Sequence, residues 1–125
     1  MKLKRESVDY IKDISEAVSK IEQFTQGIKY HDFVKDEKTV FAVLRAFEII
    51  GEATKNVSKS IKTKYANVPW REMTGIRNKL IHEYFGVINQ VIWKTLKEDI
   101  PPLKPKIEQI LQDLNKEKSS PSNAL

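Results

Sequence analysis

Apolar residues recur every three or four positions along almost the whole chain of 125 residues. Between residues 8 and 24 this spacing draws one apolar stripe down a helix, formed by Val8, Ile11, Ile14, Val18, Ile21 and Phe24. No segment shows a strand-like alternation strong enough to compete with the helical spacing. The pattern therefore predicts an all-α fold, an antiparallel bundle of about five to six helices.

The end of the first stripe and the start of the second are marked by turn and cap residues. Gly27 lies just past the first stripe, a common position for a helix to end. Residues 25–35 read as a connection, after which Asp36 can cap the next helix. That helix runs from Glu37 to about Val57, and its apolar surface is wider than one surface helix needs. It is therefore either central in the bundle or shared with a second subunit.

The second half of the chain reads as three more helices. Residues 58–65 provide one or two turns, and Pro69 marks the start of a helix that runs from Trp70 to about Phe85. Asn89 can then cap a fifth helix that runs to about residue 99.

Two adjacent prolines precede the last helix. Pro101 and Pro102 break the fifth helix, and the second proline can open a sixth. We expect residues 1–116 to form one helical domain and residues 117–125 to be a disordered tail.

Composition excludes several kinds of chemistry and location. The chain has no cysteine, which excludes disulfides, thiolate catalysis and cysteine-ligated metal sites. No apolar run approaches the ~20 residues that cross a bilayer, and the charged N-terminus does not resemble a signal peptide. We therefore expect a cytoplasmic protein with no membrane association. The net charge of +5 suits a polyanionic partner and an ordinary soluble surface equally well.

The two histidines are the candidate ligands and proton carriers. His31 lies beside Asp32 in the expected connection, with no set of convergent metal ligands nearby, so we expect a solvent or structural role and no metal. His82 follows Arg77 by five positions, which is about 140° around a helix, and follows Asn78 by four, which places those two side by side. One straight helix therefore cannot aim Arg77 and His82 at one target from a single stripe.

An arginine and a histidine together suit chemistry on a phosphodiester. Guanidinium binds phosphate oxygens in a bidentate manner, and imidazole moves a proton near neutral pH. With a ribose 2′-hydroxyl present, these functions suffice for internal transesterification without metal. On spacing alone, however, a structural surface pair is the favoured interpretation of Arg77 and His82.

The wider sequence around this pair resembles a known family. The string Arg77-x4-His82-x-Tyr84 resembles the motif of the HEPN superfamily, and specifically that of the HepT-like ribonuclease toxins. Further blocks occur in the same order as in that family, over about residues 5 to 115: Arg45, residues 48–53, residues 69–71, residues 75–84, Trp93 and residues 99–101.

The resemblance implies a homodimer in which both Arg/His motifs meet in a cleft between the subunits, and a metal-independent endoribonuclease activity that needs no cofactor. By the same resemblance, Arg77 binds phosphate, His82 is the general acid and base, and Asn78 orients the site or the RNA substrate. It also implies a toxin–antitoxin pair, in which a minimal nucleotidyltransferase antitoxin neutralises the toxin by transferring AMP to Tyr84.

Two alternatives stay open from the sequence. One is a non-catalytic HEPN module that binds nucleotide or partner for an associated nucleotidyltransferase, and the other is a nucleic-acid-binding helical protein without chemistry. Other residues have simpler interpretations: Trp70 and Trp93 as core aromatics, Gly51 as a point of close helix approach. The lysines at 55, 59, 62 and 64 form either an RNA-steering surface or a solvated face.

Overall fold

The computed structural model describes residues 5–82 and 87–119, without the side chains of residues 77, 81, 82, 87, 88, 118 and 119. Over these residues the regular structure is entirely helical, which confirms the predicted all-α class. The helices are α1 (Ser7–Thr25), α2 (Tyr30–Lys35), α3 (Glu37–Lys55), α4 (Lys59–Lys64), α5 (Trp70–His82), α6 (Val87–Glu98) and α7 (Ile100–Ser119). None of them combines the length and apolarity needed to cross a bilayer.

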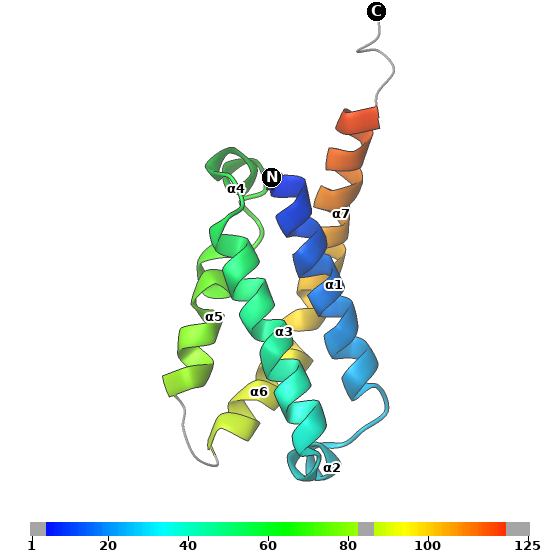
Figure 1. Cartoon of the computed structure of the whole chain (residues 1–125), viewed down its shortest axis with the longest axis vertical. Coiled ribbons are helices and arrows are strands. Elements are labelled where there is room, and N and C mark those ends of the chain that lie inside the picture. The colour runs from blue at the N-terminus through cyan, green and yellow to red at the C-terminus, as the bar shows by residue number, and fades with distance from the viewer. Residues whose placement is uncertain (1–4, 83–86, 120–125) are drawn as a thin grey trace, which may run out of the picture.

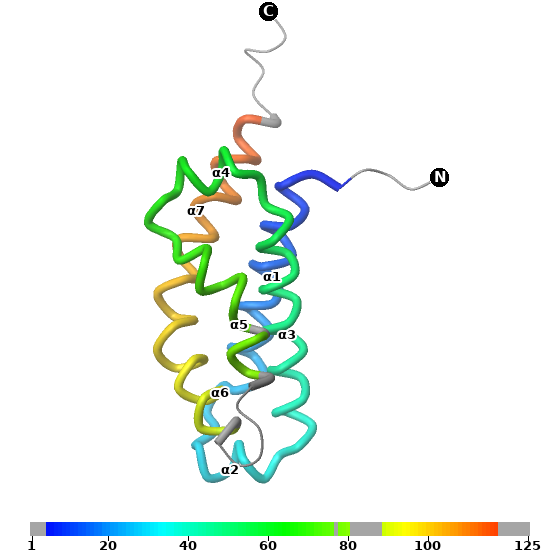
Figure 2. The backbone as a smooth tube through the Cα atoms, turned by 90° about the vertical axis from the view of Figure 1, so that its left-hand side faces the viewer, coloured from blue at the N-terminus to red at the C-terminus, as the bar shows by residue number. Residues whose placement is uncertain are grey.

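Helix α3 is the centre of the bundle. It contacts α1, α2, α5 and α6, while α7 packs on α1 and α6 (Figure 1). Seen from the side, α6 and α7 form the layer opposite α1 and α3, with α5 in front of both (Figure 2). Helix α3 is therefore central in the bundle, as the first of the two interpretations required, although Phe41 near its start stays exposed.

The core joins the apolar stripes of all the long helices. Its largest fully buried side chains come from α1, α2, α3, α6 and α7: Phe33, Phe47, Ile11, Ile14, Ile21, Ile50, Ile92, Ile107 and Ile110. The stripe predicted for residues 8–24 is buried except for Phe24 at its end. Burial of this apolar surface is the main source of the bundle's stability.

Local signals set several helix ends as predicted. Gly27 has a φ of +75°, a left-handed conformation that glycine adopts without strain, and it ends the turn after α1. The carboxylate of Asp36 accepts hydrogen bonds from the backbone N–H of Thr39 at 3.1 Å and from its hydroxyl at 2.6 Å. Ser58 caps α4 in the same way, since its hydroxyl accepts from the N–H of Ile61.

The reading of residues 25–35 as a plain connection is wrong for its second half. Residues 30–35 form α2, which buries Phe33 completely. The ring of Phe33 lies 5.1 Å from that of Trp93 on α6, and Tyr30 meets the same ring edge-on at 5.8 Å. A single turn of helix is thus stabilised by a distant aromatic partner, which local spacing does not reveal.

The boundaries around α6 and α7 also differ from those expected. Helix α6 begins at Val87, so Asn89 lies inside it and is not its cap. Helix α7 begins at Ile100, one residue before Pro101, and both adjacent prolines lie in its first turn. Prolines are tolerated there because the first N–H groups of a helix have no intrahelical partner. Helix α7 continues to Ser119, three residues beyond the expected domain end at residue 116.

The segment between α4 and α5 is held by three long-range or side-chain hydrogen bonds. The Tyr65 hydroxyl donates to Asp113 on α7 at 2.6 Å, and the indole N–H of Trp70 donates to the carbonyl of Tyr65 at 3.0 Å. The ammonium of Lys106 donates to the carbonyl of Asn67 at 3.1 Å. Burial and the bond to Asp113 raise the pKa of Tyr65 to about 12.

The Tyr65→Phe variant tests the hydrogen bond between Tyr65 and Asp113 through the pH dependence of the unfolding free energy. Because the folded pKa lies above the ordinary value of 10, the stabilisation is complete below pH 10 and is lost as pH rises towards 12. We expect the wild type to lose about 1–2 kcal/mol more of its unfolding free energy than Tyr65→Phe over that window. Urea titrations at pH values of about 9 and 12 measure this difference. Tyr10→Phe is the matched control, and identical pH profiles for wild type and Tyr65→Phe would contradict the assignment.

Candidate functional site

Helix α5 carries three of the four residues predicted to form the site, and an apolar stripe fixes its orientation. Trp70, Met73, Ile76 and Leu80, spaced by three, three and four residues, are buried in the core. This spacing keeps the four side chains on one face of α5. Every position on the opposite face is therefore turned towards solvent.

Gly51 lies where α3 meets α5, and the packing of the two helices requires a small residue at this position. A Cβ atom at Gly51 would lie 3.5 Å from the carbonyl oxygens of Met73 and Thr74 and 3.5 Å from the Ile76 side chain. An alanine would therefore just fit, but a larger side chain would meet the backbone of α5. The glycine lets the two helices approach closely along the first half of α5.

Solvent-facing positions of α5 with described side chains form one line, which we call the outer stripe: Arg71, Gly75 and Asn78. Position 82 continues this line along the helix. Asn78 and His82 follow Arg71 by seven and eleven residues, which leaves each within about 20° of it around the helix. Arg71 and Asn78 are exposed, and Gly75 has no atom near the place where a Cβ would stand. This stripe includes Arg71, which we did not predict from the sequence as a site residue, although its seven-residue spacing from Asn78 was a usable signal.

The structure describes the predicted site residues to different extents. Asn78 is described and exposed on α5. The helix includes positions 77 and 82, but the side chains of Arg77 and His82 lie outside the described residues, as does the whole of Tyr84. Their roles and their meeting in one cleft remain predictions.

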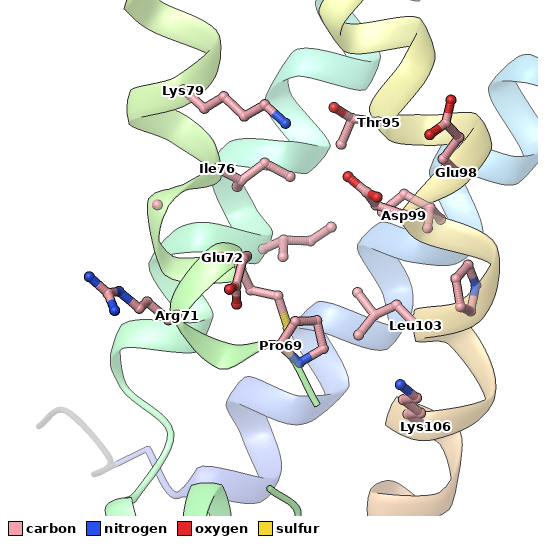
Figure 3. A pocket seen from close by; sticks show the side chains of 15 residues that line it. Pro69, Arg71, Glu72, Ile76, Lys79, Thr95, Glu98, Asp99, Leu103 and Lys106 are labelled. Atoms are coloured by element: carbon pink, nitrogen blue, oxygen red, sulfur yellow. The ribbon is translucent and has the colours of Figure 1, made fainter. Parts of the chain in front are cut away.

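A cavity of about 530 Å³ lies beside α5, between it and the junction of α6 and α7 (Figure 3). Its floor is apolar and includes Ile50, Met73, Ile76 and Leu103. In Figure 3 the Lys79 side chain reaches from α5 across the opening towards Thr95.

Charged side chains of both signs surround this cavity. Its cations are Arg71, Lys79 and Lys106, and its carboxylates are Glu72, Glu98 and Asp99. The formal charges balance, so the cavity as a whole has no preference for anions. Over the described residues, no group of three or more histidine and carboxylate side chains gathers as a metal site would require.

The other residues considered lie on the surface or pack in the core. His31 is exposed on α2, and Trp70 and Trp93 belong to or pack against the core. Arg45 is exposed and lies 3.9 Å from Glu48, while Glu52 is exposed and lies 3.9 Å from Lys55. Such solvent-screened pairs contribute little to stability.

These features define a small all-α bundle whose fifth helix carries an Arg-x4-His sequence and a solvent-facing outer stripe. A family model described as "Ribonuclease HepT-like" matches residues 14–110. The chain is 55% identical over 108 residues to "Probable ribonuclease HepT" of Thermococcus cleftensis, covering 86% of this chain and 98% of that protein. The chain belongs to the HepT-like ribonuclease family.

Two more relatives span similar lengths. "Putative RNase MJ1380" of Methanocaldococcus jannaschii is 42% identical over 105 residues, or 84% of this chain and 96% of that protein. "Putative RNase TTE0752" of Caldanaerobacter subterraneus is 44% identical over 103 residues, or 82% and 92%. No solved structure matches the chain significantly.

Proposed function

We propose that this chain is a metal-independent endoribonuclease that cleaves RNA at a site shared by two copies of the chain. The observation that carries the proposal is the family match over residues 14–110, which contains the whole Arg77-x4-His82 motif and the helix that bears it. The exposure of Asn78 on that helix adds support, because a macromolecular substrate must reach the motif from solvent.

The reaction needs two functions that this motif can supply. Arg77 binds the scissile phosphate and stabilises the charge that grows on its oxygens. His82 accepts the proton of the ribose 2′-hydroxyl as that oxygen attacks phosphorus, and an imidazolium donates a proton to the departing 5′-oxygen. Asn78, beside His82 on the helix, orients the RNA by hydrogen bonding. The products are a 2′,3′-cyclic phosphate and a free 5′-hydroxyl.

The separation of Arg77 and His82 around α5 favours a shared site. The two positions are about 140° apart on the helix, so they do not face one target together. When two copies meet about a two-fold axis, the arginine of one can face the histidine of the other. The roles then divide between subunits without any distortion of the helix.

An exposed apolar surface lies at the end of the bundle where α5 ends and α3 begins. Phe41, on α3, is 66% exposed, and Phe24, near the end of α1, is 40% exposed; they are the exposed large apolar side chains among the described residues. The C-terminal end of α5 and the N-terminal end of α3 point to the same end of the bundle (Figure 1). An exposed phenylalanine near the motif is the kind of contact that association of two copies would bury.

Phe41→Glu tests whether this surface joins two copies. We expect the wild type to sediment as a dimer and the variant as a monomer, because a charge in an apolar interface lacks a partner. Cleavage should fall with dissociation, by roughly 100-fold or more if one subunit cannot complete the site. Gln23→Glu adds the same charge at an exposed α1 position and should remain dimeric. A dimeric and active Phe41→Glu would place the interface elsewhere.

Substitutions in the motif test the chemistry itself. Arg77→Ala and His82→Ala should each lower the rate of RNA cleavage by roughly 10²–10⁴-fold, and Arg77→Lys should lie between, because lysine keeps the charge but loses the bidentate geometry. His31→Ala, the other histidine, should cleave like the wild type. The assay contains EDTA throughout, and circular dichroism confirms the fold of each variant. Abolition of wild-type cleavage by the chelator, or full activity of His82→Ala, would refute the mechanism.

We also propose that a minimal nucleotidyltransferase silences this ribonuclease as its antitoxin, by transferring AMP to Tyr84. The support is the position of Tyr84, two residues after His82, together with the resemblance to toxin–antitoxin members of the family. A bulky anion at that position would occupy the space of the RNA phosphate and repel it.

Tyr84→Phe separates modification from cleavage. Co-expressed with its nucleotidyltransferase partner, the wild type should gain the mass of added AMP and lose activity, whereas Tyr84→Phe should keep its mass and cleave RNA. Intact-protein mass spectrometry and an RNA cleavage assay measure both effects. Tyr30→Phe should be modified normally, and continued labelling of Tyr84→Phe would remove Tyr84 from this role.

A further inference from the structure

We propose that the RNA strand continues from the motif along the outer stripe of α5 into a basic hollow, where side chains of α4, α5 and α7 bind its phosphates. This inference rests on the proposed ribonuclease function and extends it to the path of the substrate. The hollow measures about 560 Å³ and contains three cations: Lys62, Arg71 and Lys106. Among the described residues that line it, Glu72 is the one carboxylate, which leaves them a formal charge of +2.

The cations converge from three separate helices. Lys62 belongs to α4, Arg71 to the first turn of α5 and Lys106 to α7. Residues that far apart in sequence gather here only because the tertiary fold brings them together. The hollow therefore differs from the row of lysines on α4, whose members share one short helix.

Hydrogen bonds fix the floor of the hollow before any ligand arrives. The ammonium of Lys106 donates to the carbonyl of Asn67, and the indole of Trp70 donates to that of Tyr65. Tyr65 is in turn bonded to Asp113 on α7. A phosphate that binds here meets a segment already ordered, so little conformational entropy is lost on binding.

Among the residues that the structure describes, none of the three cations forms an ion pair, and Lys106 donates to a backbone carbonyl. Within the described part of the chain, Lys64 is 3.5 Å from Glu117 and Lys55 is 3.9 Å from Glu52, whereas Lys62 and Arg71 form no ion pair. Their charges are available to phosphate oxygens without the loss of an existing contact. Arginine adds the bidentate geometry that phosphate favours.

The outer stripe connects the hollow to the motif. Arg71 precedes His82 by eleven residues, which is about three turns and about 16 Å along the same face of α5. Between them Gly75 presents no side chain, and its surroundings are open. Position 75 therefore places no side chain in the way of a strand that runs from Asn78 to Arg71. In Figure 3 the Arg71 guanidinium points away from the neutral cavity.

The salt dependence of RNA binding tests this path. The probe is a 2′-O-methyl oligonucleotide of about 12 nucleotides, which lacks the attacking hydroxyl and so is bound without being cleaved. For Lys62→Ala/Arg71→Ala we expect the slope of log K against log salt to become shallower by about 1.4 per occupied hollow, and binding at 0.1 M salt to weaken by about 25-fold. Cleavage of a dinucleotide, too short to reach the hollow, should stay at the wild-type rate.

A matched variant removes the same charge elsewhere. Lys12→Ala/Lys29→Ala changes two exposed lysines that have no ion pair among the described residues, and it should keep the wild-type slope. Thermal melting confirms that both double variants are folded. If the wild type binds and cleaves RNA but the two variants share its slope, the path is wrong and the ribonuclease assignment stands. If the wild type neither binds the oligonucleotide nor cleaves RNA, the proposed function fails and this inference with it.

Discussion

The packing of α5 on α3 determines which residues of α5 face the solvent and so can take part in a binding site. Four large side chains of α5, from Trp70 to Leu80, are buried against the core, and each contributes about 1.5–3 kcal/mol. The exposed ion pairs of α3 contribute at most about 1 kcal/mol each. The apolar stripe therefore decides the rotation of α5, and Gly51 decides how closely the helix approaches. If α5 were rotated about its axis by one residue, about 100°, part of its apolar stripe would be exposed to solvent. The outer stripe would then no longer face outward.

The N-terminal end of α5 is held in place by hydrogen bonds. Tyr65, Asn67 and Trp70 each take part in a hydrogen bond that closes the segment between α4 and α5 onto α7 or onto itself. These bonds join residues up to 48 positions apart. Together with Val68 and Trp70, which belong to the core, these bonds order the segment that lines the hollow.

Sequence reasoning was accurate at Gly27 and Asp36, which act within a few residues of the helix ends they set. It did not single out Ser58 as a cap, and it made Asn89 the cap of a helix that contains it. It failed where the cause is distant. Helix α2 depends on the contact of Phe33 with Trp93, sixty positions away, and no periodicity within six residues signals such a partner.

The candidate site likewise has one part that the sequence indicated and one part that it did not. The motif on α5 was noticed through its resemblance to a known family, because its spacing alone favoured a structural pair. The hollow was not noticed, because Lys62, Arg71 and Lys106 come together only after α4, α5 and α7 have packed. The lysines of α4 were noticed, but the sequence could not separate Lys62, which faces the hollow, from Lys64, which lies near Glu117. That distinction requires the tertiary structure.

The symmetry of the proposed dimer constrains how an RNA strand would use two hollows. A two-fold axis that crosses α5 relates two identical outer stripes that run in opposite directions. With that geometry, a strand that follows one stripe towards the shared motif would leave along the other, and each hollow would hold the backbone on one side of the scissile bond. Because these contacts involve phosphates and not base edges, they hold the strand in place without selecting its sequence.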